Sequence, residues 1–219
     1  MSSCPFVSFV DRRPPLWYKQ YMRLQVRIVA GTLRGRKLTY TADPHLRPTP
    51  QMVREALFSI LGNAVPGRPF FDIFAGTGAV GLEALSRGAD PLTFVERDFQ
   101  LVRAIEDNLR KFAVADRGGV TRADVYRWGE HYQPPDEPVN VFLSPPFADY
   151  ERRPEDLMAV VAGMQERTHP GSVVVLQADR EVPFTGLPDA EHWEERHYGR
   201  NQLLIWVKES QPSPTTEES

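Results

Sequence analysis

Cysteine is nearly absent from this chain, because Cys4 is its single cysteine. One cysteine excludes an internal disulfide and any cysteine-rich metal site, which fits a reducing compartment such as the cytoplasm. The histidines are scattered without metal-ligand spacing, so we expect no metal centre. No apolar run is long enough for a membrane helix, and the N-terminus lacks the regions of a signal peptide. These absences favour a cytoplasmic protein.

Acidic side chains are almost missing from the segment between Arg12 and Arg54. The segment holds ten lysines and arginines but one acid, Asp43, although the whole chain carries a formal net charge of −3. This asymmetry predicts a basic arm that meets a polyanion while the rest of the chain does something else. A solvated surface is the alternative interpretation.

The length of 219 residues is sufficient for one sizeable core and favours a single main domain with a small extension. Residues 1–21 are expected to form a flexible leader, and residues 210–219 a disordered polar tail. Residues 22–62 are predicted to form the basic extension. It contains a β-hairpin with strands at 25–30 and 36–40, and then a helix over 51–61 that Gly62 closes.

From residue 63 to residue 209 the hydrophobic pattern alternates between strands and helices. Strands are predicted at 70–74, 92–95, 120–123, 139–143 and 172–177. Helices are predicted from a glycine turn to about residue 87, over 99–112 and over about 154–167. A closing hairpin is predicted at 193–198 and 202–207. The pattern indicates an α/β fold, a Rossmann-like sheet with helices on both faces and an antiparallel strand from the closing hairpin.

A glycine-rich turn follows the first strand of this domain and opens a helix. It reads Asp-Ile-Phe-Ala-Gly-Thr-Gly-Ala-Val-Gly over residues 72–81, and its glycines let a ligand lie against bare main chain. The spacing also fits a dinucleotide fingerprint, and a tight packing turn without a ligand is a further alternative. Asp72 favours S-adenosylmethionine, because a carboxylate at the strand end attracts the ammonium group of this cofactor and repels a pyrophosphate.

Two further acids close the next two strands. Glu96 stands where an acid accepts hydrogen bonds from ribose hydroxyls, although this placement serves NAD equally well. Asp124 is placed to accept from an adenine amino group or, alternatively, to cap a helix. The cofactor-binding residues predicted in and around these motifs are Asp72, Phe74, Ala75, Gly76, Thr77, Gly78, Gly81, Glu96, Arg97, Asp124 and Val125.

The motif Ser144-Pro145-Pro146-Phe147 follows the strand at 139–143, at the same sheet edge as the glycine turn. Two prolines stiffen the backbone and remove two N–H donors, so free carbonyls and the serine hydroxyl face a substrate, and Phe147 offers a stacking surface for an unpaired base. An exocyclic amine on an aromatic base is a poor nucleophile, and acceptors for its hydrogens direct its lone pair at a sulfonium methyl. We therefore predict that these four residues are catalytic. A proline-rich turn without chemistry is the alternative.

Taken together, the motifs resemble the bacterial 16S ribosomal RNA guanine-N2 methyltransferases of the RsmD type. The resemblance rests on residues 27–38, 47–58, 72–89 and 144–147, and it extends over about residues 22–208. It implies a seven-stranded class I methyltransferase domain at 63–209, with S-adenosylmethionine as cofactor. It also implies methyl transfer to a guanine N2 in 16S rRNA of the assembling small subunit. Thr49 and Arg54 would border the cofactor in such a protein.

The basic extension then becomes an RNA-binding element, because glycines between its charged residues allow close approach to a phosphate backbone. The predicted RNA-binding residues are Arg27, Arg34, Arg36, Lys37 and Arg47. The expected partner is 16S rRNA or a small-subunit particle, and we expect a monomer without a metal or a membrane.

Ser144 departs from the family's pattern, which usually has an acid or asparagine at this position. A serine hydroxyl is an uncharged and weaker acceptor. One hypothesis is therefore the guanine-N2 enzyme, or an amino-methyltransferase for another base or nucleic acid. A second is a methyltransferase-fold RNA-binding assembly factor without turnover. A third, an NAD-dependent oxidoreductase, is allowed by the glycine spacing alone but leaves the Ser144–Phe147 motif and the basic arm unexplained.

Overall fold

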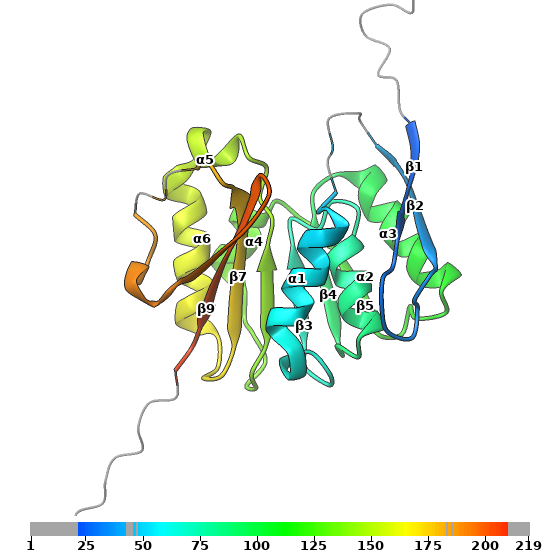
Figure 1. Cartoon of the computed structure of the whole chain (residues 1–219), viewed down its shortest axis with the longest axis horizontal. Coiled ribbons are helices and arrows are strands. Elements are labelled where there is room, and N and C mark those ends of the chain that lie inside the picture. The colour runs from blue at the N-terminus through cyan, green and yellow to red at the C-terminus, as the bar shows by residue number, and fades with distance from the viewer. Residues whose placement is uncertain (1–21, 43–45, 47, 183, 185, 210–219) are drawn as a thin grey trace, which may run out of the picture.

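A computed structural model of the chain describes residues 22–209, except 43–45, 47, 183 and 185 (Figure 1). The predicted leader, the predicted tail and Arg47 therefore lie outside the described residues. Within the described part, no helix has the length and apolarity that crossing a bilayer requires.

A seven-stranded sheet with the order β5-β4-β3-β6-β7-β9-β8 forms the centre of the molecule. Neighbouring strands from β5 to β7 pair in parallel, whereas β9 is antiparallel to both β7 and β8. The strands are β3 (Phe70–Ile73), β4 (Leu92–Glu96), β5 (Gly118–Arg122), β6 (Asn140–Leu143), β7 (Val173–Asp179), β8 (Glu194–Tyr198) and β9 (Asn201–Val207). This arrangement confirms the predicted Rossmann-like fold with a closing antiparallel hairpin. The strand order reverses between β3 and β6, and ligands of such sheets bind outside the carboxyl ends at that point.

Helices cover both faces of the sheet (Figure 1). The first face is covered by α1 (Gln51–Leu61), α2 (Ala79–Ser86) and α3 (Phe99–Lys111), and the second by α4 (Val125–His131), α5 (Asp149–Arg152) and α6 (Pro154–Arg167). Two short 3-10 helices, η1 (Gly62–Ala64) and η2 (Ala190–His192), lie between these elements. Alternate side chains of one strand enter opposite cores, as β6 shows with Phe142 in the first core and Val141 and Leu143 in the second.

The extension begins with a two-stranded antiparallel hairpin of β1 (Met22–Arg27) and β2 (Lys37–Ala42), which lies beside α3 (Figure 1). The Asn108 side chain of α3 accepts from the Thr39 N–H at 3.0 Å and donates to the Thr39 carbonyl at 2.9 Å. The buried Glu83 carboxylate of α2 accepts from the N–H groups of Val29 and Ala30 at 2.8 and 2.9 Å. The hairpin is thus fastened to two helices of the main domain.

Several predicted boundaries are wrong. Strand β1 begins three residues before the predicted start, and β5 begins two residues early because Gly118 and Gly119 pair with β4 despite their weak strand preference. Strand β3 ends at Ile73, since Phe74 has a left-handed φ of 61°. Helix α4 was anticipated only through the alternative that Asp124 caps a helix, and α5 was not predicted, because seven and four residues are too few for a helical period to stand out.

Candidate functional site

A cavity of about 800 Å³ opens at the carboxyl ends of the parallel strands, at the place where the strand order reverses. It brings together residues from the glycine turn, the ends of β4 and β5, the Ser144–Phe147 segment and the segment before α1. The predicted site residues among its lining are Thr49, Asp72, Phe74, Ala75, Gly76, Thr77, Glu96, Arg97, Asp124, Val125, Ser144, Pro145, Pro146 and Phe147.

Asp72 lines this cavity and is 1% exposed. Its Oδ2 accepts from the Gly81 N–H of α2 at 2.8 Å. Burial raises the pKa of Asp72 to about 8, and the nearby Glu96 carboxylate adds to the rise, whereas the Gly81 hydrogen bond opposes it. A carboxylate that is buried without a cationic partner is suited to an incoming ammonium group.

Glu96 shapes the glycine turn from the end of β4. One carboxylate oxygen accepts from the Gly76 N–H at 2.8 Å, and the other accepts from the N–H groups of Arg97 and Asp98, each at 2.8 Å. Asp124 is the N-cap of α4, since its Oδ1 accepts from the Tyr126 N–H at 3.0 Å. Asp124 also lines the cavity, so the capping role and the predicted ligand role are compatible.

Three of the predicted cofactor-binding residues do not line the cavity. A Cβ on Gly78 would approach Ile105 Cγ1 of α3 to 2.8 Å, and one on Gly81 would overlap the Phe94 ring of β4. Gly78 therefore serves close packing against α3, and Gly81 close packing of α2 against the sheet. Arg54 is 2% exposed, and it donates to the carbonyls of Thr49 at 2.7 Å and Arg27 at 2.9 Å. Burial lowers the pKa of this guanidinium, against the opposing charge of Glu83. Arg54 therefore does not contact the cavity itself but holds the backbone of Thr49, which lines it.

The Ser144–Phe147 segment leaves β6 and forms another wall of the cavity. Pro145 is buried, whereas Phe147 is 44% exposed. The Pro146 carbonyl accepts from the Asp149 N–H at 2.8 Å, so this carbonyl is not free as we expected. Among the described residues, no hydrogen bond engages the carbonyls of Ser144 or Pro145, and these two remain for a substrate.

Polar residues that sequence reasoning missed also line the cavity. Gln177 at the end of β7 accepts the Thr49 hydroxyl at 2.9 Å and the Ser144 hydroxyl at 3.4 Å. Its side-chain amide donates to Asn201 Oδ1 at 2.9 Å. The Tyr126 hydroxyl donates to Asp149 at 2.7 Å, and burial followed by this bond raises the pKa of Tyr126, which keeps the phenol neutral. Gln177 follows four apolar residues of β7, and this break in the apolar run is the sequence signal that could have indicated it.

The basic residues of the extension are arranged outside the cavity. Arg27, Arg34, Arg36 and Lys37 are all exposed. The Arg36 guanidinium lies 5.6 Å from the centre of the Phe112 ring, and Lys111 donates to the Lys37 carbonyl at 2.9 Å. The hairpin thus presents positive charge next to the C-terminal end of α3.

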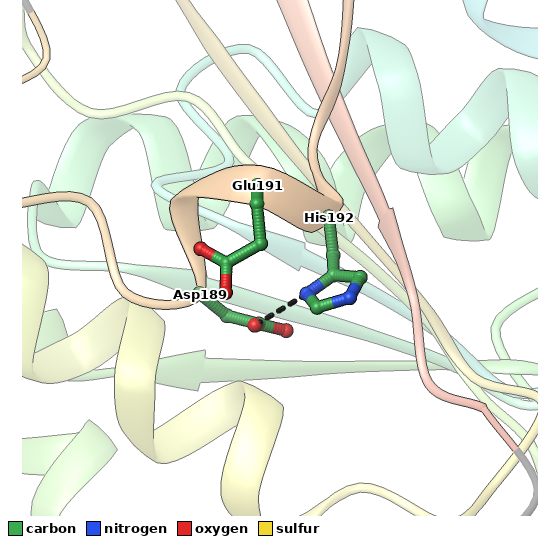
Figure 2. Close-up of side chains that lie close together, drawn as sticks. All are labelled: Asp189, Glu191 and His192. Atoms are coloured by element: carbon green, nitrogen blue, oxygen red, sulfur yellow. Dashed lines mark hydrogen bonds and ion pairs between the residues drawn. The ribbon is translucent and has the colours of Figure 1, made fainter.

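Three exposed side chains of the types that bind metals lie close together at η2 (Figure 2). They belong to Asp189, Glu191 and His192. His192 Nδ1 is 2.6 Å from Asp189 Oδ1, and the Trp206 indole donates to Asp189 Oδ2 at 2.7 Å. The bond with Asp189 raises the pKa of His192 and engages the Nδ1 atom of its imidazole. Both Asp189 oxygens are engaged, so we assign these side chains no metal.

The donors and charges of the cavity fit S-adenosylmethionine better than a dinucleotide. Even without Asp72, whose raised pKa favours the neutral form in the ligand-free protein, the lining has more acidic than basic residues, with Glu96, Asp98, Asp124 and Asp179 against Arg97 and Arg200. A cationic ammonium and sulfonium are favoured there, whereas a pyrophosphate is repelled. Gly76 has a φ of 54°, and a Cβ on it would meet nothing closer than 3.9 Å, so the space beside its bare main chain is open. The sheet and this cavity define a class I, S-adenosylmethionine-dependent methyltransferase.

Comparisons with known proteins identify the family. Residues 26–207 match the protein-family model described as "Conserved hypothetical protein 95". The chain is 33% identical to the Bacillus subtilis protein named "Putative rRNA methyltransferase YlbH" over 84% of this chain and 99% of that protein. It is 40% identical to the Escherichia coli "Ribosomal RNA small subunit methyltransferase D" over 56% of this chain and 61% of that protein.

A solved structure agrees with these sequence matches. The Escherichia coli structure described as "Putative methyltransferase yhhF" has a TM-score of 0.69 and 28% identity, and the match covers 85% of this chain and 99% of that one. The chain belongs to the RsmD-type family of class I rRNA methyltransferases. The oxidoreductase hypothesis is therefore wrong.

Proposed function

We propose that this methyltransferase transfers a methyl group from S-adenosylmethionine to the exocyclic N2 amino group of a guanine in 16S rRNA. The observation that supports this most is that Ser144–Phe147 and the acids Asp72 and Glu96 line one cavity. The cofactor-binding and amine-binding groups are thereby held on the carboxyl ends of adjacent strands. The names of the E. coli and B. subtilis relatives support rRNA as the substrate class.

The cavity offers the cofactor a complementary set of groups. When bound, S-adenosylmethionine supplies an electrophilic methyl group on a sulfonium. Asp72 would hold the ammonium group, and Glu96 would accept from the ribose hydroxyls beside the Gly76 turn. Asp124 and Val125 would border the adenine.

The target amine would be held by the Ser144 hydroxyl and by the free carbonyls of Ser144 and Pro145. Acceptors for both amino hydrogens pull electron density onto the nitrogen and aim its lone pair at the methyl carbon. Phe147, exposed at the cavity wall, would stack on the guanine that has left its helix. The cofactor would supply the methyl group and its sulfur would keep the electron pair of the carbon–sulfur bond, while the surplus proton of the amine that these residues hold would leave to water.

The basic hairpin would bind the RNA backbone while the base enters the cavity. Its exposed arginines and lysine supply affinity that does not depend on sequence. Because Arg54 contacts both the Arg27 carbonyl of the hairpin and the Thr49 carbonyl of the cavity wall, the two parts form one substrate-binding unit.

The direct test uses tritiated S-adenosylmethionine and small ribosomal subunits from a strain that lacks the corresponding gene. After incubation with the purified chain, the RNA is digested to nucleosides and separated. Label in N2-methylguanosine is expected, whereas label in another nucleoside would replace guanine N2 as the target. Measurable cofactor and RNA binding without any label would favour the RNA-binding assembly factor without turnover.

A further inference from the structure

Gln177 has no role in the chemistry described so far, although it is 3% exposed and lines the cavity beside Ser144. We infer that Gln177 is a positioning residue, which orients the Ser144 hydroxyl so that its oxygen accepts a hydrogen bond from the target amine. This inference rests on the proposed function, since it concerns the amine that the Ser144–Phe147 segment would hold.

The need for such a residue follows from the chemistry of a hydroxyl. Serine carries one O–H donor and two acceptor lone pairs, and the hydroxyl hydrogen rotates freely. If the hydroxyl hydrogen points at the amine, Ser144 presents a donor there instead of a lone pair, and the hydrogens of the amine lose their acceptor. Ser144 can accept from the substrate only when its proton is directed elsewhere.

Gln177 Oε1 provides that other direction. It lies 3.4 Å from Ser144 Oγ, and among the described residues it is the only side-chain partner of this hydroxyl. This distance is longer than that of a typical O–H···O hydrogen bond, so the interaction is weak, but it still favours the hydroxyl orientation in which the proton points at Gln177. The lone pairs of Ser144 Oγ are then available to a group inside the cavity.

Contacts from three other elements hold Gln177 in this orientation. Its Oε1 accepts the Thr49 hydroxyl at 2.9 Å, and its Nε2 donates to Asn201 Oδ1 of β9 at 2.9 Å. The Tyr150 hydroxyl of α5 donates to the Gln177 backbone carbonyl at 2.8 Å. The amide oxygen is therefore directed towards the two hydroxyls, and the amide nitrogen away from them.

This arrangement compensates for the departure at position 144. An asparagine or aspartate oxygen accepts hydrogen bonds without any hydrogen of its own to direct. A serine needs an acceptor behind it, which Gln177 supplies. The dependence on Gln177 should accordingly disappear when the acceptor at position 144 carries no hydroxyl.

A double-mutant cycle tests this coupling. Methyl transfer to the RNA substrate is measured for the wild type, Gln177→Leu, Ser144→Asn and the double variant, with kcat and KM separated. We expect Gln177→Leu to lower kcat about tenfold when residue 144 is serine, with KM and cofactor affinity within about twofold. In the Ser144→Asn background the same change should lower kcat by less than about twofold.

Two further variants control for a merely structural role. Gln165→Leu removes a buried glutamine of α6 that does not line the cavity, and it should leave kcat unchanged. Gln177→Glu keeps the acceptor oxygen, and it should retain more than about a third of kcat even if the leucine variant does not fold.

Equal losses in both backgrounds, a loss confined to KM or cofactor affinity, or a tenfold loss in Gln177→Glu would overturn the inference. A wild-type protein that transfers no methyl group to any RNA would instead overturn the proposed function, and the inference with it. The two failures are distinct, because the wild type is the reference of the cycle.

Discussion

Asp72 shows at the scale of one residue how the site is prepared for a cation. Its pKa is raised to about 8 because the side chain is buried. In the ligand-free protein the neutral form of Asp72 is therefore favoured at pH 7. The stability that this group contributes is fully present below its unfolded pKa of 3.8 and is lost as the pH rises through about 8. A bound ammonium would reverse this preference and favour the carboxylate.

Cofactor binding should therefore release a proton at pH 7. Asp72 is mostly protonated at that pH and must ionise to pair with the ammonium group, so we expect about half to one proton per site. Isothermal titration calorimetry in buffers of different ionisation enthalpy measures this number. Asp72→Asn should abolish the release, and a wild-type binding enthalpy independent of the buffer would contradict the prediction.

Phe147 carries a second prediction at this scale. Phe147→Ala should lower methyl transfer about 10- to 100-fold, because stacking of a base on an aromatic ring contributes about 1–3 kcal/mol. The free energy of unfolding should hardly change, since the ring is 44% exposed. Met52→Ala is a matched control, because Met52 is 54% exposed on α1 and does not line the cavity. Equal activity in both variants would exclude stacking on Phe147.

The cavity residues that the sequence predicted belong to continuous motifs. Asp72 lies one residue before the end of β3, Glu96 ends β4 and Ser144 directly follows β6, and parallel strands place their carboxyl ends at one sheet edge. Gln177 was missed because its partners are distant, with Thr49 separated from it by 128 positions and Ser144 by 33. Only the tertiary fold shows that these side chains meet.

At the scale of elements, the turn after β1 is fastened to α2. Gly31 has a φ of 78°, and a Cβ on it would overlap the carbonyl group of Ser86. The Thr32 N–H donates to that carbonyl at 2.7 Å, and the Leu33 N–H donates to Ser86 Oγ at 2.9 Å. The absence of a side chain at Gly31 is thus a requirement for docking the hairpin.

Substitutions at two glycines of this turn distinguish the contribution of the docking contact from that of backbone strain. Gly35 also has a positive φ, 83°, but a Cβ on it would meet nothing within 4 Å. Gly35→Ala should cost about 1–2 kcal/mol of unfolding free energy, which is the cost of a left-handed alanine. Gly31→Ala should cost about 1–3 kcal/mol more because of the overlap. Denaturant unfolding measures both, and equal losses would contradict the docking contact.

Long periodic elements were predicted well, and short ones were not. Helix α3 has 13 residues with a clear apolar face, and its predicted range differs from the observed one by a single residue. Helix α4 follows the Asp124 cap but has only seven residues. The strands of the N-terminal hairpin were predicted at 25–30 and 36–40, but they lie at Met22–Arg27 and Lys37–Ala42, because residues 28–30 are apolar and continue the pattern of β1.

At the scale of the whole molecule, the positive charge of the hairpin is separated from the acidic cavity. The basic hairpin lies beside α3, towards the β5 edge of the sheet, and β8 forms the opposite edge (Figure 1). RNA bound by the hairpin would therefore be attracted to one end of the molecule, and the acidic lining would be left to the cationic cofactor.

The double variant Arg34→Ala/Lys37→Ala should weaken RNA binding and reduce its salt dependence. Each lost phosphate contact should lower the slope of log affinity against log salt by about 0.7–0.9. Arg196→Ala on β8 is the control, since this exposed arginine lies at the opposite sheet edge and pairs with Glu194. An unchanged slope in the double variant would place the RNA elsewhere.

The most direct test of the central claim is made on ribosomes in the cell. Nucleosides from 16S rRNA of a strain lacking the gene are quantified by mass spectrometry, with and without the plasmid-borne chain. We predict that deletion removes about one equivalent of N2-methylguanosine per 16S rRNA, which the wild type restores and a folded Phe147→Ala variant does not restore fully. An N2-methylguanosine content that is the same in all strains would contradict the account.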